Sequence, residues 1–161
     1  MHKFLCIIKQ GILLTRRCFW NFEDDIRCLN PLLNKLVGGS ATSQHCRGEA
    51  ADCALSPRFM TEPSMSALRR EIKTRVTEIT GKLLRPDVNT NFMLFAYVCL
   101  NLKELDIDQV IHEYGEDFGR PAWVHIASSR RMDKRQVLIV GSYTKWRYLR
   151  LTVEETLAYA T

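Results

Sequence analysis

The stretch Ser43-Gln44-His45-Cys46-Arg47-Gly48-Glu49-Ala50-Ala51-Asp52 decides how the chain is interpreted. It places a histidine in a polar loop and an aspartate in a run of small residues, Ala50–Leu55, that predicts a short buried strand. A buried aspartate needs a partner, and a divalent cation shared with His45 would satisfy it. His125, on another predicted strand, is the candidate third ligand. Two histidines and one carboxylate, with a fourth position open to water, form a catalytic zinc arrangement.

These residues also allow plainer interpretations. A buried aspartate often caps a turn or pairs with an arginine, and Arg47 is near Asp52 in the sequence. His125 alone is equally consistent with a hydrogen-bonded core histidine. The spacing therefore leaves the metal site as one of several hypotheses.

The remaining periodicity predicts an α+β domain with a small, mostly antiparallel sheet flanked by helices. Apolar residues recur every three or four positions from Ser66 to Leu84, which is typical of an amphipathic helix, and a second helix begins near Thr90 or Asn91. Strand-like runs and a terminal helix follow, at Gln109–Tyr114, Trp123–Ala127, Gln136–Gly141 and Val153–Ala160.

Composition favours one compact domain over residues 1–161. The chain is 46% apolar and 25% charged, which excludes disordered and low-complexity classes. The apolar run Phe4–Leu14 is interrupted by Lys9 and Gln10 and has no small-residue cleavage site, so we expect neither a membrane span nor a signal peptide. The six cysteines include no C-x-x-C pair, which favours free thiols in a reducing compartment.

The net charge of +5 is unevenly distributed. Residues 104–117 contain six acids and no base, whereas residues 128–150 contain seven bases and one acid. The basic segment could bind a polyanion, or it could be a solvated face beside the acidic segment. No recognition helix or aromatic RNA-binding motif accompanies it, so we expect no specific nucleic-acid partner.

Three pieces of the sequence resemble the zinc D-Ala-D-Ala carboxypeptidase superfamily, which includes phage L-alanyl-D-glutamate endolysins and shares the hedgehog fold. The first runs from Pro31 through Gly38-Gly39-Ser40 into Ser43-x-His45-x-x-Gly48-x-Ala50-Ala51-Asp52. The others are Asp106–Gly115 and Pro121–Ile126, the latter followed by Arg135–Leu138. The small phage-associated branch is the most similar.

The resemblance implies that His45, Asp52 and His125 are zinc ligands. Several branches carry an acid three residues before the last histidine, but Ala122 occupies that position here. We therefore take Glu113 as the general base, with Glu116 and Asp117 behind it; a solvated acidic turn is the alternative. Arg27 is the candidate for the family's carboxylate-binding arginine, although it lies two positions early.

Three further residues have expected supporting roles. Ser43 should orient the His45 loop by a local hydrogen bond. Gly48 should permit the turn that follows His45. Trp123 could either stack against substrate or pack in the sheet.

The family likeness also implies a function. We expect a zinc metallopeptidase that hydrolyses peptidoglycan stem peptides through metal-activated water, of the phage or prophage lysin type. It would act as a monomer, be made in the host cytoplasm and reach the cell wall after release. Residues 1–30 match the family poorly, and residues 56–88 resemble a helical insertion. The alternative is a catalytically impaired wall-binding or virion-assembly module that keeps the fold.

Overall fold

The computed structural model describes residues 26–27, 43–45, 49–128 and 134–161, with only the backbone at 26–27. Its strands are β1 (Ile26–Arg27), β2 (Ala50–Cys53), β3 (Gln109–Glu113), β4 (Trp123–Ala127), β5 (Gln136–Val140) and β6 (Leu149–Leu151). Its helices are α3 (Ser66–Thr80), α4 (Thr90–Leu100) and α5 (Val153–Ala158), with short 3₁₀ turns η2 (Pro57–Met60), η3 (Pro63–Met65) and η4 (Ser142–Thr144). The α+β class predicted from the sequence is confirmed.

The strands form one six-stranded mixed sheet in the order β1-β2-β4-β3-β5-β6. Every neighbouring pair is antiparallel except β3 and β5, which run parallel. β4 lies between β2 and β3, so the run Ala50–Cys53 is hydrogen-bonded to a strand that follows it by about seventy residues. This pairing brings the two halves of the predicted metal site together.

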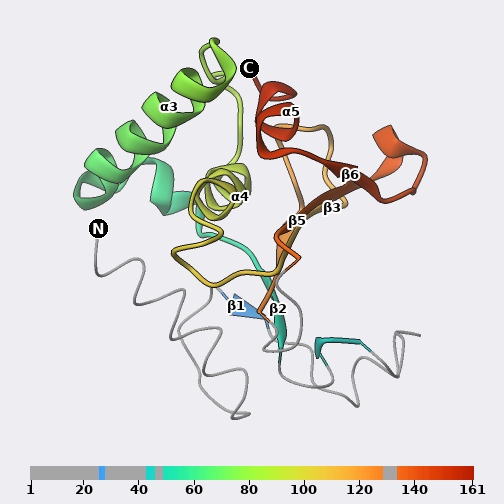
Figure 1. Cartoon of the computed structure of the whole chain (residues 1–161). Coiled ribbons are helices and arrows are strands. Elements are labelled where there is room, and N and C mark those ends of the chain that lie inside the picture. The colour runs from blue at the N-terminus through green and yellow to red at the C-terminus, as the bar shows by residue number, and fades with distance from the viewer. Residues whose placement is uncertain (1–25, 28–42, 46–48, 129–133) are drawn as a thin grey trace.

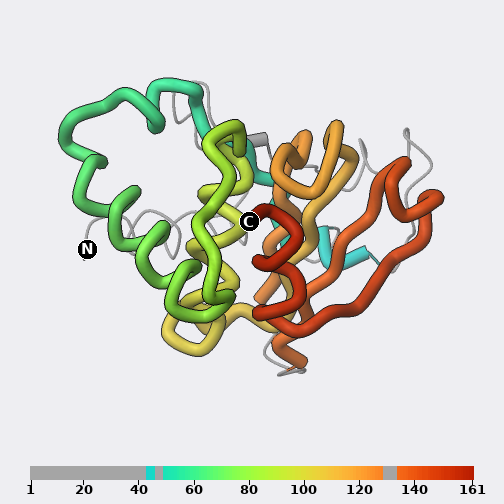
Figure 2. The backbone as a smooth tube through the Cα atoms, turned by 90° about the horizontal axis from the view of Figure 1, so that it is seen from above, coloured from blue at the N-terminus to red at the C-terminus, as the bar shows by residue number. Residues whose placement is uncertain are grey.

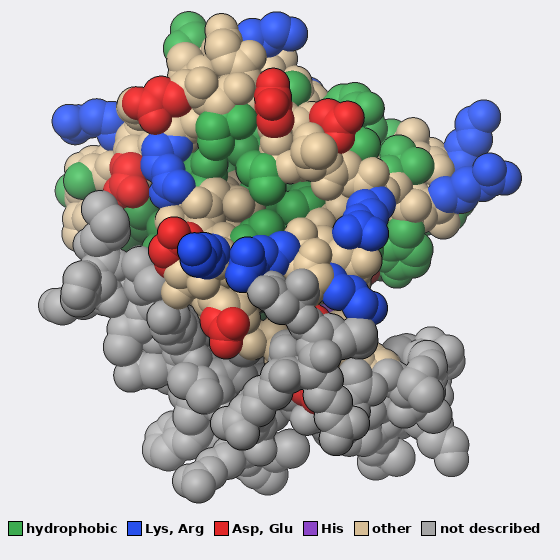
Figure 3. Space-filling model, in the orientation of Figure 1, with side chains coloured by type: hydrophobic (Ala, Val, Ile, Leu, Met, Phe, Trp, Pro, Cys, Tyr) green, Lys and Arg blue, Asp and Glu red, His purple; other side chains and the backbone are tan. Residues whose placement is uncertain are grey.

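The helices stack in layers on one face of the sheet (Figures 1 and 2). α4 and α5 contact the sheet, and α3 lies outside them and contacts both. All eleven residues of α4 are buried, because the helix is enclosed by α3, α5 and the sheet. The buried surface of this helix therefore extends around its whole circumference. On the side shown in Figure 3, apolar side chains gather between charged groups of both signs.

The side chains of the sheet divide by alternation into two sets. Val110, Val124, Ile126, Val137 and Ile139 belong to the apolar core formed with the helices. The residues between them project from the opposite face, which we call the site face. His125 and Asp52 occupy opposite positions on this face.

One asparagine joins the helical layer to the strands of the site. Asn91 accepts a hydrogen bond from the Leu55 N–H through Oδ1 at 2.7 Å. Its Nδ2 donates to the Ala122 carbonyl at 2.7 Å. Because Leu55 follows β2 and Ala122 precedes β4, Asn91 fixes both strands at the same end.

The first predicted helix ends earlier than its apolar pattern suggested. α3 stops at Thr80 because Gly81 adopts a left-handed conformation, with φ of 70°, and caps the helix. Leu83, which the pattern assigned to the buried stripe, lies beyond the cap and is 80% exposed. The segment 56–88 contains α3, which begins at Ser66 as the apolar periodicity predicted.

A tight turn connects β3 to the segment before β4. The Tyr114 N–H donates to the Val140 carbonyl, and the Glu116 N–H donates to the Arg120 carbonyl. Gly115 lies so close to Arg120 that a Cβ atom would collide with the carbonyl oxygen of that residue. Only glycine fits at this point.

Within the described residues, no helix is both long and apolar enough to span a bilayer. Cys99 is a buried thiol. Several predictions fall outside the described residues: those for residues 1–25 and 28–30, Arg47, Gly48 and the cysteines 6, 18, 28 and 46.

Candidate metal centre

Strand pairing places the three predicted ligands within reach of one another. Asp52 on β2 lies opposite His125 on β4, and His45 comes from the loop before β2. The His45 N–H donates to Ser43 Oγ at 3.3 Å, the local hydrogen bond expected of Ser43. His45, Asp52 and His125 form a group that could hold a metal ion.

The three nearest ligand atoms form a compact triangle. His125 Nδ1 lies 3.0 Å from Asp52 Oδ1, His45 Nε2 lies 3.3 Å from the same oxygen, and the two ring nitrogens are 3.0 Å apart. Ligands about 2.0–2.1 Å from a tetrahedral ion are separated from one another by roughly 3.3 Å. The triangle therefore has the size that one small cation requires.

Protons alone cannot satisfy this triangle. If both ring nitrogens donate to Asp52, their two N–H groups oppose each other across 3.0 Å. If one of them is an acceptor, it loses its hydrogen bond to the carboxylate. A cation accepts a lone pair from all three atoms at once, so the donor set fits a metal better than it fits a hydrogen-bond network.

The charges in the cluster also suit a cation. Burial opposes ionisation of Asp52, but hydrogen bonds from His125 and His45 lower the pKa of its carboxyl group to about 2. Burial likewise opposes protonation of His45, but the hydrogen bond and charge of Asp52 raise its pKa. Asp52 is therefore a carboxylate at neutral pH. Two imidazoles and one carboxylate suit zinc and several other transition metals.

Glu113 lies on the same face as the ligands. It follows Ile111 by two residues, and Ile111 lies opposite His125, so alternation projects Glu113 toward the cluster. The side chain is only 7% exposed, which rules out a solvated acidic turn. Burial and the negative charge of Asp52 raise the pKa of Glu113.

Trp123 fixes the orientation of the Glu113 carboxylate. The two residues are opposite each other in β4 and β3, and the indole Nε1–H donates to Glu113 Oε2 at 2.6 Å. The sequence offered stacking or packing for Trp123 and missed this hydrogen bond. Pairing Glu113 with Trp123 requires the register of two strands, which the sequence alone does not supply.

The next two acids do not belong to the centre. Glu116 forms an ion pair with Arg120 at 2.9 Å, and Asp117 forms one with Arg85 at 3.2 Å. Neither arginine belongs to the basic segment. These acids therefore stabilise the turn and do not stand behind Glu113.

Arg27 is placed only through its backbone. It pairs with Asp52 in the register of β1 and β2, so the candidate arginine occupies the strand next to a ligand. Its side chain lies outside the described part of the structure.

The sequence matches no protein-family model. No curated protein and no solved structure matches it.

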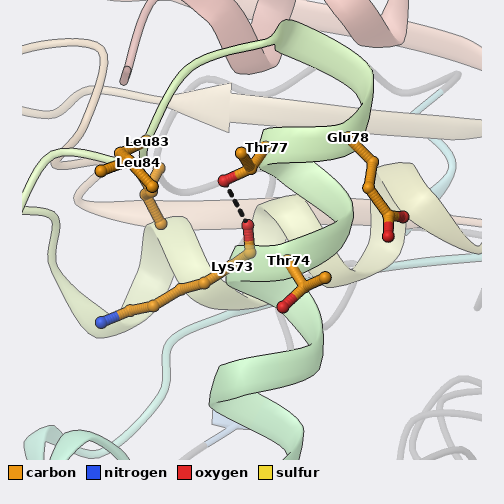
Figure 4. Close-up of a pocket in the computed structure, with 6 residues that line it drawn as sticks. All are labelled: Lys73, Thr74, Thr77, Glu78, Leu83 and Leu84. Carbon is orange, nitrogen blue, oxygen red and sulfur yellow. Dashed lines mark hydrogen bonds between the residues drawn. The ribbon is translucent and has the colours of Figure 1, made fainter.

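A hollow beside the C-terminal half of α3 contains none of these residues (Figure 4). It is lined by Lys73, Thr74, Thr77, Glu78, Leu83 and Leu84. Thr77 Oγ1 donates to the Lys73 carbonyl at 3.0 Å, which is an ordinary hydrogen bond within a helix. No cluster of metal ligands or paired titratable groups among the described residues lies in this hollow.

Proposed function

We propose that this chain is a zinc-dependent peptidase that hydrolyses stem peptides of peptidoglycan, with the hedgehog and D-Ala-D-Ala carboxypeptidase fold. The observation that supports the proposal is the convergence of His45, Asp52 and His125 at 3.0–3.3 Å. The resemblance of the sequence around these ligands supports the assignment to lysins of phage or prophage type, acting as monomers on the wall after release.

His45, Asp52 and His125 would hold the zinc ion. Bound zinc supplies Lewis acidity, which polarises a carbonyl and lowers the pKa of water to about 7. The chain itself supplies the proton transfer: Glu113 takes a proton from the attacking water and returns it to the leaving amine. Its burial on the face of the ligands suits a base that acts on water held there.

Two other residues would assist the reaction. Trp123 holds Glu113 Oε2 and keeps the carboxylate in one orientation. Arg27, beside Asp52 in the register, is the proposed partner of a substrate carboxylate, because a guanidinium binds carboxylates through paired hydrogen bonds.

The proposal is tested by measuring bound zinc and the release of muropeptide fragments with and without a chelator. Asp52→Ala should remove both the metal and the activity. Glu113→Gln should retain zinc and lower turnover roughly 10²- to 10⁴-fold, the usual contribution of a general base. The matched control is Glu116→Gln, which changes an exposed acid three residues away and should retain full activity.

A catalytically impaired wall-binding or virion-assembly module is the second candidate. Ala122 favours it, because no acid stands three residues before His125. Tight binding to cell-wall sacculi without product release, in a protein that still binds zinc, would identify this alternative. A protein that neither binds zinc nor releases muropeptide fragments would contradict the proposal that this chain is an enzyme.

A further inference from the structure

Four aromatic residues gather beside the metal centre, and we call them the aromatic platform: Tyr114, Trp123, Trp146 and Tyr148. The ring centroids of Tyr114 and Trp123 are 5.0 Å apart, and those of Tyr114 and Trp146 are 5.9 Å apart. Tyr114 is 40% exposed, Tyr148 56% and Trp146 64%. Exposed aromatic rings therefore lie side by side here, although Tyr114 and Trp146 are more than thirty residues apart in the sequence.

Two members of the platform stand on strained backbone. Tyr114 has φ of 49° and Trp146 has φ of 59°, in the left-handed region that bulky residues seldom adopt. Lys145 shares this conformation, with φ of 53°. The Trp146 N–H is fixed by a hydrogen bond to the Gly141 carbonyl at 2.9 Å. Such strain is retained mainly where function requires it, and an indole that is mostly exposed adds little to the core.

The platform is physically continuous with the proposed base. The ring of Trp123 contacts the ring of Tyr114 at an interplanar angle of 52°, and its indole N–H donates to Glu113. Tyr148 lies within electrostatic reach of Tyr114, Glu113 and Asp52. A ligand resting on Tyr114 and Trp146 therefore lies directly beside the metal centre.

We propose that the aromatic platform binds a hexosamine ring of the peptidoglycan glycan strand, so that the enzyme acts on stem peptides still attached to sugar. The inference rests on the proposed function. Stem peptides consist of small and charged residues, which offer no wide apolar face. A pyranose ring does offer one, and its C–H groups pack on the electron-rich faces of indole and phenol rings.

The charge around the platform agrees with this substrate. Lys145 and Arg147 flank Trp146 and are exposed. Their positive charges suit the carboxylates of a stem peptide that leaves the sugar toward the metal centre. Saccharide and peptide would therefore be recognised by neighbouring groups.

The test is a calorimetric titration of the full chain with a soluble oligomer of N-acetylglucosamine, in the presence of a chelator. We expect binding by the wild type and a roughly three- to ten-fold weakening in Trp146→Gly, the size of one aromatic contact. Glycine adopts the φ of residue 146 without strain, so the Tm of this variant should be equal or higher. Trp146→Phe should bind with intermediate affinity.

Leu83→Ala is the matched control, because it removes another exposed apolar side chain far from the platform in sequence; its sugar affinity should be unchanged. Failure of the wild type to bind the sugar, or equal binding by Trp146→Gly, would overturn the proposal, as would a lower Tm without a loss of binding. Muropeptide release without sugar binding refutes the platform alone. Sugar binding without release refutes the peptidase and leaves the platform standing.

Discussion

Two buried histidines on neighbouring strands show how differently the two faces of this sheet are organised. His112 on β3 projects into the helical core, where its ring contacts Phe92 and Phe95. Both of its nitrogens have protein partners: Nδ1 lies 2.7 Å from the Tyr143 hydroxyl and Nε2 lies 3.0 Å from the Phe118 carbonyl. A neutral imidazole that donates from Nε2 and accepts at Nδ1 satisfies both contacts.

His125 on β4 projects from the site face and is not satisfied in this way. Its Nδ1 shares Asp52 with His45, and its Nε2 is buried without a hydrogen-bond partner among the described residues. The two residues, His112 and His125, are 1% and 8% exposed. Burial therefore does not distinguish the structural histidine from the candidate ligand. The two differ in how many of their ring nitrogens have a hydrogen-bond partner.

The largest expected effect is on zinc affinity, which should depend on His125 and not on His112. His125→Ala should weaken zinc binding by roughly 100-fold or more, because even residues that merely support a ligand contribute about 10- to 100-fold. His112→Phe should leave the affinity unchanged. Calorimetric zinc titration of both variants measures the difference, and equal affinities would remove His125 from the centre.

The pH dependence of the free energy of unfolding should show that His112 is buried as a neutral ring. Burial lowers the pKa of this ring to about 4, below its ordinary value of 6.5. The unfolded chain therefore takes up the proton first as the pH falls. The contribution of neutral His112 to the free energy of unfolding is complete above pH 6.5 and is lost as the pH falls from 6.5 to about 4. It amounts to at most about 3 kcal/mol. Urea denaturation at a series of pH values, with chelator present, measures this loss. In His112→Phe the same curve should be flatter, and an unchanged slope would contradict the assignment.

The hydrogen bonds of His112 should also matter at neutral pH. His112→Phe leaves the Phe118 carbonyl without its donor, so the free energy of unfolding should fall by about 1–3 kcal/mol. Chemical denaturation at pH 7 measures the change. A variant as stable as the wild type would show that the core tolerates the loss.

The smallest effect concerns the link between base and platform. Trp123→Phe keeps an aromatic ring against Tyr114 but removes the hydrogen bond to Glu113. Turnover should fall about ten-fold, equivalent to one charge-assisted hydrogen bond, while zinc content stays constant. Steady-state kinetics with metal analysis checks this, and a change in KM alone would assign Trp123 to substrate binding.

The elements of the fold could largely be predicted from the sequence, because their patterns are local. The strand Trp123–Ala127 was predicted with its observed ends. The end of α3 was not, since the left-handed conformation of Gly81 overrides an apolar pattern that continues to Leu83. The full burial of α4 depends on neighbours contributed by α3, α5, η2 and two strands of the sheet, which periodicity does not reveal.

The metal ligands of the candidate site could be predicted from the sequence motif, but the residues around them could not. The resemblance singled out His45, Asp52 and His125 together. The Trp123 hydrogen bond to Glu113 depends on strand register. The platform depends on positive φ values at Tyr114 and Trp146, which these residue types rarely adopt and no sequence pattern indicates.

The glycine of the β3 turn has a consequence for mutational tolerance. Gly115 follows Glu113 and Tyr114 directly, and any side chain there would push the turn away from the Arg120 carbonyl. Such a shift would move the proposed base and the first platform ring together. A saturation library should therefore tolerate few replacements at Gly115, a residue without a reactive group of its own.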